Sequence, residues 1–121
     1  MDSKLIREIT RLNFEDILWG ITIITGILSI IGNYCEKEYL KTNQYVFKNR
    51  ANKLFEITAV VTLLIYIYFW QRNYNAYEKC SERDKKLYLI KLLGSSFLIA
   101  GSICLIYFQF KQEDFIGSPG I

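Results

Sequence analysis

Charge is absent from three long windows of this chain, although Asp, Glu, Lys and Arg make up 22% of its residues. The windows run from Ile17 to Asn33, from Ile57 to Gln71 and from Leu92 to Phe110. This segregation is expected when the windows lie in hydrocarbon and the remaining segments meet water or lipid headgroups. We therefore predict a small integral membrane protein that crosses the bilayer three times.

A soluble three-helix bundle is the competing interpretation. A soluble helix carries polar residues along one face with a period near 3.6, whereas these windows are apolar on every side. The first and third windows approach the ~20 residues that cross a bilayer, and the second reaches that length only if Leu54 and Phe55 are included. We predict one all-α transmembrane domain over residues 1–121, with spans at about 15–34, 54–72 and 88–110.

The segment before the first span has the pattern of a short interfacial helix. Leu5, Ile9 and Leu12 recur at helical spacing. Elsewhere around the turn lie the charged residues Lys4, Arg7, Glu8 and Arg11. Asn13 is placed to cap the helix that follows, so we expect the chain to bend there and enter the membrane.

The connections between the spans are short. Cys35–Thr42 is polar, and Asn43 is a plausible cap for the second helix. Ser81, followed by Asp84 three residues later, resembles a capping box for the third helix, which predicts a tight hairpin between helices two and three. The stretch Gly117–Ile121 contains two glycines and a proline, which is typical of a short, loose tail.

The residue inventory argues against catalysis and against metal or cofactor binding. The chain has no histidine, and its three cysteines do not form a zinc or haem pattern. Every Asp and Glu lies outside the three windows, and no nucleophile set or phosphate-cradling glycine loop is present. We expect no enzyme activity, catalytic residue, cofactor or metal. The net charge of +3 forms no basic run, so we expect no nucleic-acid partner.

The first and third spans carry small and hydroxyl residues at helix-packing intervals. Such residues let helices approach closely in lipid and hydrogen-bond across the contact. One interpretation is that helices one and three pack around the bulkier second helix, and the other is that the first-helix stripe faces another protein or lines a pore. The candidate positions are Thr22, Gly26, Ser29 and Asn33 in the first helix, and Gly94 and Gly101 in the third.

Aromatic residues form a second candidate surface. Tyr66, Trp70 and Tyr74 fall on one face of the second helix and lead toward the hairpin. Tyr and Trp favour the headgroup level, so an interfacial belt is the simpler explanation. The alternative is an aromatic docking surface for a partner.

These features favour a non-enzymatic accessory, interaction or immunity-type membrane subunit, with the lipid bilayer and a membrane-protein partner or a second copy as its contacts. The alternative is a self-associating pore that resembles a holin, a small membrane permeabiliser, or a small channel. Abundant Ile, Lys, Asn and Tyr suggest an AT-rich genome, most simply bacterial. We expect a multi-pass protein of the bacterial cytoplasmic membrane.

The Lys and Arg count near the span ends predicts a cytoplasmic N-terminus. Cys35 should then react with a membrane-impermeant maleimide in intact cells, and Cys80 only after lysis, since the two lie on opposite sides of the membrane. Labelling of single-cysteine variants measures this directly. The reverse pattern would invert the assignment.

Overall fold

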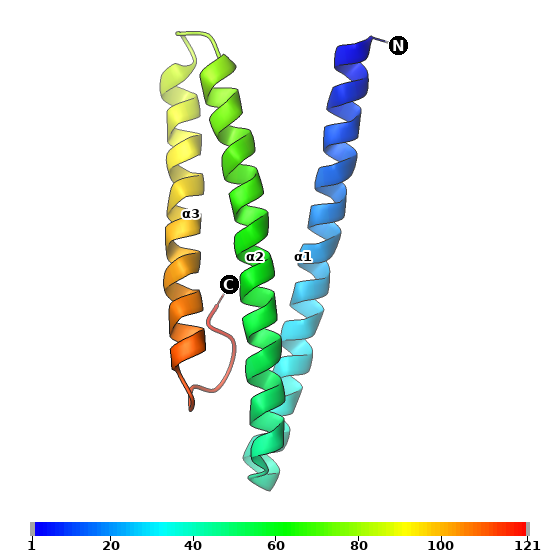
Figure 1. Ribbon diagram of the computed structural model, residues 1–121, viewed down its shortest axis with the longest axis vertical. Coiled ribbons are helices and arrows are strands. Elements are labelled where there is room, and N and C mark those ends of the chain that lie inside the picture. Colours follow the sequence, from blue (N-terminus) through cyan, green and yellow to red (C-terminus); the bar gives the residue numbers. More distant parts are fainter. Residues whose placement is uncertain (1, 121) are drawn as a thin grey trace.

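Three long helices make up almost the whole chain in the computed structural model, which describes residues 2–120 (Figure 1). Helix α1 spans Ser3–Thr42, α2 spans Tyr45–Lys79 and α3 spans Lys85–Lys111, and residues 2–120 contain no strand. Each helix is long and apolar enough to cross a membrane. The prediction of an all-helical protein with three potential membrane spans is confirmed.

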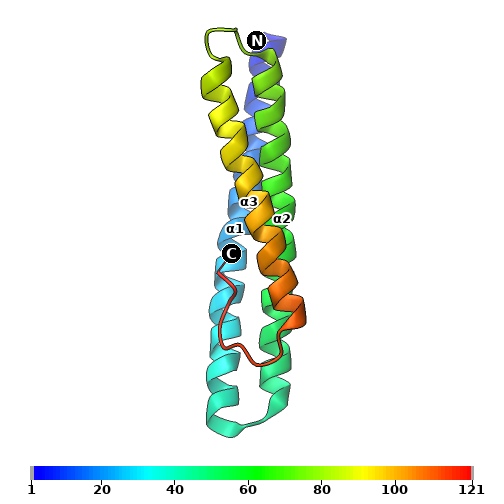
Figure 2. The ribbon, with the colours of Figure 1, turned by 90° about the vertical axis from the view of Figure 1, so that its left-hand side faces the viewer.

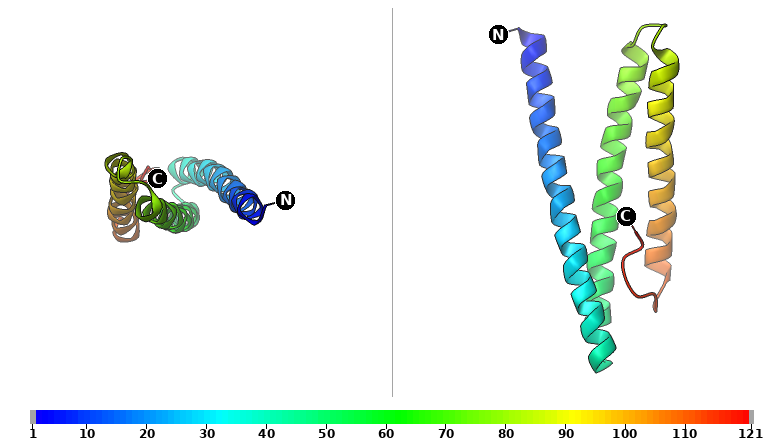
Figure 3. Two further views of the ribbon diagram at one scale, coloured as in Figure 1. Left: turned by 90° about the horizontal axis from the view of Figure 1, so that it is seen from above. Right: turned by 180° about the vertical axis from the view of Figure 1, so that it is seen from behind.

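Helix α2 lies between the other two helices. Both α1 and α3 pack against α2, and within the described chain α1 does not approach α3. Viewed from above, the three helices form a bent row with α2 in the middle (Figure 3). As a result, all four buried apolar residues of the described chain lie on α2, while α1 and α3 each keep a broad outer face. The buried apolar residues are Ala51, Phe55, Ala59 and Ile65.

The predicted bend at Asn13 is wrong, because α1 continues through this residue without interruption. The expected interfacial helix is therefore the first turns of α1 rather than a separate element. An Asn in a helix interior costs less than about 0.7 kcal/mol, whereas a break near hydrocarbon leaves backbone groups without partners. The cap is Asp2 instead, whose carboxylate accepts a hydrogen bond of 3.2 Å from the Lys4 backbone N–H.

The connection between α1 and α2 is also tighter than predicted. The polar stretch Cys35–Thr42 is helical, which leaves only Asn43 and Gln44 between the two helices. Asn43 adopts the left-handed conformation at φ 56°, and its N–H donates to the Tyr39 carbonyl at 2.7 Å. Asn43 therefore ends α1, a position that suits Asn because it tolerates the left-handed conformation better than most residues do. The N-cap of α2 is Gln44, so the prediction that Asn43 caps α2 is wrong.

The predicted hairpin between α2 and α3 is present, with residues 80–84 as its connection. The predicted capping box is not formed, because the Ser81 hydroxyl donates to the Asp84 carboxylate at 3.2 Å and α3 begins only at Lys85. The Lys85 ammonium closes the turn. It donates to the Tyr77 carbonyl at 2.7 Å and lies 4.4 Å from the centre of the Tyr77 ring.

The residues that directly follow α3, Gln112 to Phe115, are docked on the helices. After α3 the chain turns back along the bundle (Figure 2). The Gln112 side chain donates to the Asn52 side chain at 3.3 Å and accepts from the Phe115 backbone N–H at 2.8 Å. The Phe115 ring contacts Phe108 edge-on at 5.2 Å. These contacts involve residues that precede Gly117, so the loose tail expected over Gly117–Ile121 stays a prediction, and Ile121 lies outside the described residues.

Among the glycines of the chain, Gly32 is the one that lies directly against a neighbouring helix. A Cβ atom at this position would lie 2.6 Å from the Phe55 ring, whereas the same atom at Gly26, Gly94 or Gly101 would meet nothing within 4 Å. Toward the N-terminus of α1 the two helices diverge (Figures 1 and 3). Gly32 is therefore the glycine that permits close packing in this chain.

We predict that Gly32→Leu lowers the free energy of unfolding by about 1–3 kcal/mol, because the added bulk forces Phe55 and α1 apart. Gly26→Leu is the matched control and should leave stability nearly unchanged. Reversible denaturation in mixed detergent micelles provides the measurement. Equal losses for the two variants would show that α1 does not pack on α2 through Gly32.

Candidate functional site

The Glu15 carboxylate on α1 contacts three side chains, two residues before the first uncharged window begins at Ile17. Glu15 is only 5% exposed. It accepts from Arg72 at 2.7 Å and from the Tyr68 hydroxyl at 3.2 Å, both on α2, and lies 3.4 Å from Arg11. The Phe14 and Tyr68 rings pack edge-on at 5.1 Å beside this cluster. The contacts join α1 and α2 where the two helices have begun to diverge.

A second ion pair joins α1 to α2 at the other end. Lys48 and Glu36 are 1% and 2% exposed, and the Lys48 ammonium lies 2.8 Å from the Glu36 carboxylate. The same ammonium donates to the backbone carbonyl of Phe115. One buried lysine thus connects α1, α2 and the C-terminal segment.

The separation of the two ion pairs corresponds to the thickness of a membrane. Glu15 and Glu36 lie on the same helix, roughly 32 Å apart at 1.5 Å per residue, and hydrocarbon is about 30 Å thick. Their partners Arg72 and Lys48 lie roughly 36 Å apart on α2. We infer that the two pairs lie at the two hydrocarbon boundaries, where a paired charge costs less than it would at the bilayer centre.

Neutral hydrogen bonds join α2 to α3. The Trp70 indole N–H donates to the Ser96 hydroxyl at 2.8 Å, and the Asn73 amide donates to the Ser95 hydroxyl. Such bonds are worth on the order of 0.6 kcal/mol each in membranes. Ser102 and Gln109 continue the line at seven-residue intervals from Ser95, and both are 1% exposed. In the described chain the Ser102 hydroxyl and the Gln109 amide have no hydrogen-bond partner.

The predicted stripe on α1 does not form the contact with α2. Thr22, Gly26 and Asn33 are exposed and Ser29 is half-buried. The buried neighbours are Thr25 and Gly32, which lie beside the stripe. The structure therefore does not use these four residues as the main packing face within the chain, and contact with another protein stays a prediction.

Gly94 and Gly101 lie on exposed positions of α3 with open space around them. The face of α3 that meets α2 carries Ser95, Ser102 and Gln109 instead. The two glycines are thus not brought together with any part of α1 or α2. Their role as interaction candidates is likewise a prediction.

The aromatic candidates on α2 divide into two groups. Trp70 is half-buried, bonds to Ser96 and stacks on Tyr74 at 5.5 Å with 13° between the rings, so it helps to join α2 to α3. Tyr66 is half-buried and Tyr74 is 38% exposed. Glu78 raises the pKa of the Tyr74 phenol by accepting its hydrogen bond and by its negative charge.

The four residues of the two ion pairs were not among the candidates predicted from the sequence. A signal was available in the chain. Leu18, Thr25 and Gly32 recur at seven-residue intervals, and Glu36 follows four residues after Gly32 on the same side of the helix. Extending the packing face beyond the uncharged window would have reached Glu36.

Among residues 2–120, no group of three or more His, Cys, Asp or Glu side chains is arranged to hold a metal ion. Comparison of the chain with known protein families, with characterised proteins and with solved structures found no match.

We predict that Lys48→Met lowers the free energy of unfolding by about 3–5 kcal/mol, since it leaves the Glu36 carboxylate buried without its cation. The double variant Glu36→Gln/Lys48→Met should lose less than Lys48→Met alone, because the orphaned charge is removed. Lys53→Met, at an exposed lysine without an ion-pair partner among residues 2–120, is the control. Stability is measured by denaturation in mixed micelles. A loss in the double variant equal to the sum of the losses in Glu36→Gln and Lys48→Met would contradict a coupled pair.

Proposed function

We propose that the protein is a non-enzymatic accessory subunit, of interaction or immunity type, that binds another integral membrane protein through the stripe on α1. The observation that carries this proposal is the open space at Gly26. A glycine there has no packing role within the chain, since no atom lies within 4 Å of its Cβ position. Glycine at a helix surface in lipid permits the close approach of a further helix.

The surroundings of Gly26 support the same proposal. Thr22 and Asn33 are exposed on the same side of α1, and α3 does not approach this helix. A partner helix laid along this stripe would meet small or polar side chains over three turns. It would also lie beside the α1–α2 contact at Thr25 and Gly32, so it could touch both helices.

The setting we propose is the bacterial cytoplasmic membrane, with the N-terminus in the cytoplasm. The cations near the N-terminus of α1 and the α2–α3 connection outnumber those at the opposite ends of the helices, which favours this orientation. An accessory role needs no cofactor or catalytic group, which fits the absence of histidine from the chain.

The holin-like pore is less well supported. A pore requires hydroxyl groups that face water, but the Thr22 hydroxyl already donates to the Leu18 carbonyl of its own helix at 3.0 Å. Thr25 points to the α2 side and donates to the Thr22 carbonyl at 2.7 Å. The Thr22 hydroxyl of the stripe therefore needs no water to accept its proton.

We predict that affinity purification from natively expressing cells, in mild detergent, recovers a second membrane protein with the wild-type chain and not with Gly26→Leu. Ile27→Phe adds bulk to a neighbouring exposed position about a quarter turn around the helix, and should keep the partner. All three chains should have equal thermal stability. Recovery of the bare wild-type monomer in every detergent, or equal loss in both variants, would contradict the proposal.

A further inference from the structure

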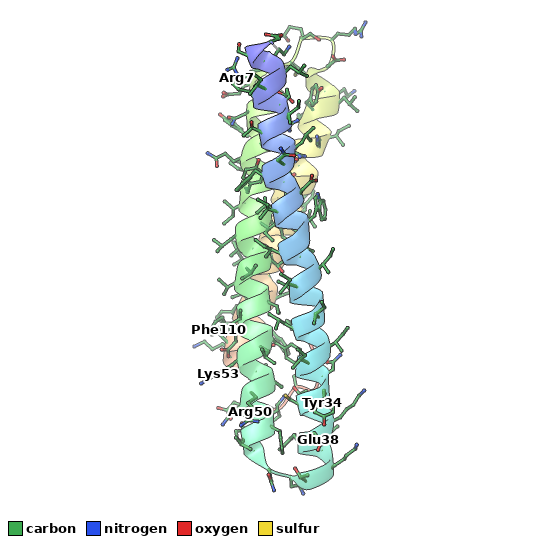
Figure 4. The ribbon with its side chains drawn as sticks, turned by 90° about the vertical axis from the view of Figure 1, so that its right-hand side faces the viewer. Arg7, Tyr34, Glu38, Arg50, Lys53 and Phe110 are labelled. Atoms are coloured by element: carbon green, nitrogen blue, oxygen red, sulfur yellow. The ribbon has the colours of Figure 1, made fainter. Side chains whose placement is uncertain are left out.

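The divergence of α1 from α2 near the N-terminus opens a cleft lined by cations. It consists of two adjoining hollows of about 350 and 380 Å³, which share Glu8, Arg11 and Lys79. Arg72 lines the first hollow, and Lys4 and Arg7 line the second. Figure 4 shows Arg7 near the N-terminal end of α1. Five cations from two helices thus border one cleft.

The carboxylates of the cleft neutralise only part of this charge. Arg11 pairs with Glu8 at 2.8 Å, and Arg72 pairs with Glu15 at 2.7 Å. No carboxylate among residues 2–120 lies within 4 Å of Lys4, Arg7 or Lys79. Like charges that face each other across a cleft repel. A bound anion attracts each of these cations and so offsets their mutual repulsion.

The position of the cleft along the membrane normal indicates which kind of anion it binds. Glu15 marks the hydrocarbon boundary, and Arg11 and Arg7 lie about one and two turns beyond it, at the headgroup level and just outside. Below the cleft, Trp19 of α1 and Phe69 of α2 lie 5.7 Å apart and present apolar surface to acyl chains. Basic pockets between membrane helices are suited to the phosphate groups of anionic lipids.

We propose that the cleft between the N-terminal turns of α1 and the C-terminal turns of α2 binds the phosphate of an anionic phospholipid. Arg7 and Lys79 contact the phosphate from opposite sides, and Lys4 adds to the positive field. Arg11 and Arg72 keep their carboxylate partners and form the floor. This inference is independent of the proposed protein partner, which would bind along the middle of α1.

The test is native mass spectrometry of the full chain released from phosphatidylcholine nanodiscs that contain a minority of phosphatidylglycerol. The wild type should retain phosphatidylglycerol. Arg7→Gln/Lys79→Gln should lower its apparent affinity on the order of tenfold or more, since each cation near an anionic headgroup contributes separately. Both residues are exposed, and unchanged thermal stability verifies that the variant folds.

The matched control is Lys37→Gln/Lys53→Gln, which removes the same charge from exposed positions at the other end of α1 and α2, where Figure 4 labels Lys53. It should retain the lipid as the wild type does. Equal lipid retention in all three chains, or an equal loss in both variants, would overturn the proposal.

Soluble competitors distinguish the source of the anion. Glycerol phosphate should displace the lipid only weakly, because it lacks acyl chains. Displacement by glycerol phosphate as effective as that by short-chain phosphatidylglycerol would overturn the lipid in favour of a free phosphate. Displacement by soluble oligoglutamate alone would overturn it in favour of an acidic protein segment.

Discussion

The buried pair between Glu36 and Lys48 is the interaction on which the rest of the structure depends. It lies between the two-residue connection and the Gly32–Phe55 contact, so it fixes the register of α1 against α2. Desolvation offsets much of the attraction within a buried pair, so we infer that its main contribution in this chain is to the register of the two helices. The same lysine holds the Phe115 carbonyl, and so the register of the first hairpin also positions the C-terminal segment.

The two helix contacts of α2 use different chemistry. Charged groups join α1 to α2 at the two ends, whereas hydroxyl, amide and indole groups join α3 to α2 in the half of the contact nearer their connection. Charge is tolerated at the boundaries and costly at the bilayer centre, while neutral hydrogen bonds are affordable at either level. Between the two ion pairs, α1 therefore stays close to α2 through the packing of the Phe55 ring against Gly32.

Both proposed surfaces exist because α1 diverges from α2 toward its N-terminus. Close contact near Gly32 and divergence toward the N-terminus leave a middle section with an unused glycine stripe and an upper section with a basic cleft. The stripe suits another helix because Gly26 is open, and the cleft suits a phosphate because Arg7 and Lys79 have no carboxylate partner among residues 2–120. A lipid in the cleft would also screen the repulsion between the two diverging helices.

The sequence by itself determined the class of fold, since charge-free windows of this length are stable as helices in hydrocarbon, where every backbone group must bond within its own segment. It also indicated the α2–α3 hairpin. It did not reveal that α1 runs unbroken through Asn13, or that Gly32 rather than Gly26 meets α2. Helical spacing shows which residues share a face, but several faces of an apolar helix are equivalent in lipid. Only the tertiary structure decided among them, because pairing Glu36 with Lys48 and Glu15 with Arg72 requires one rotation of α1 against α2.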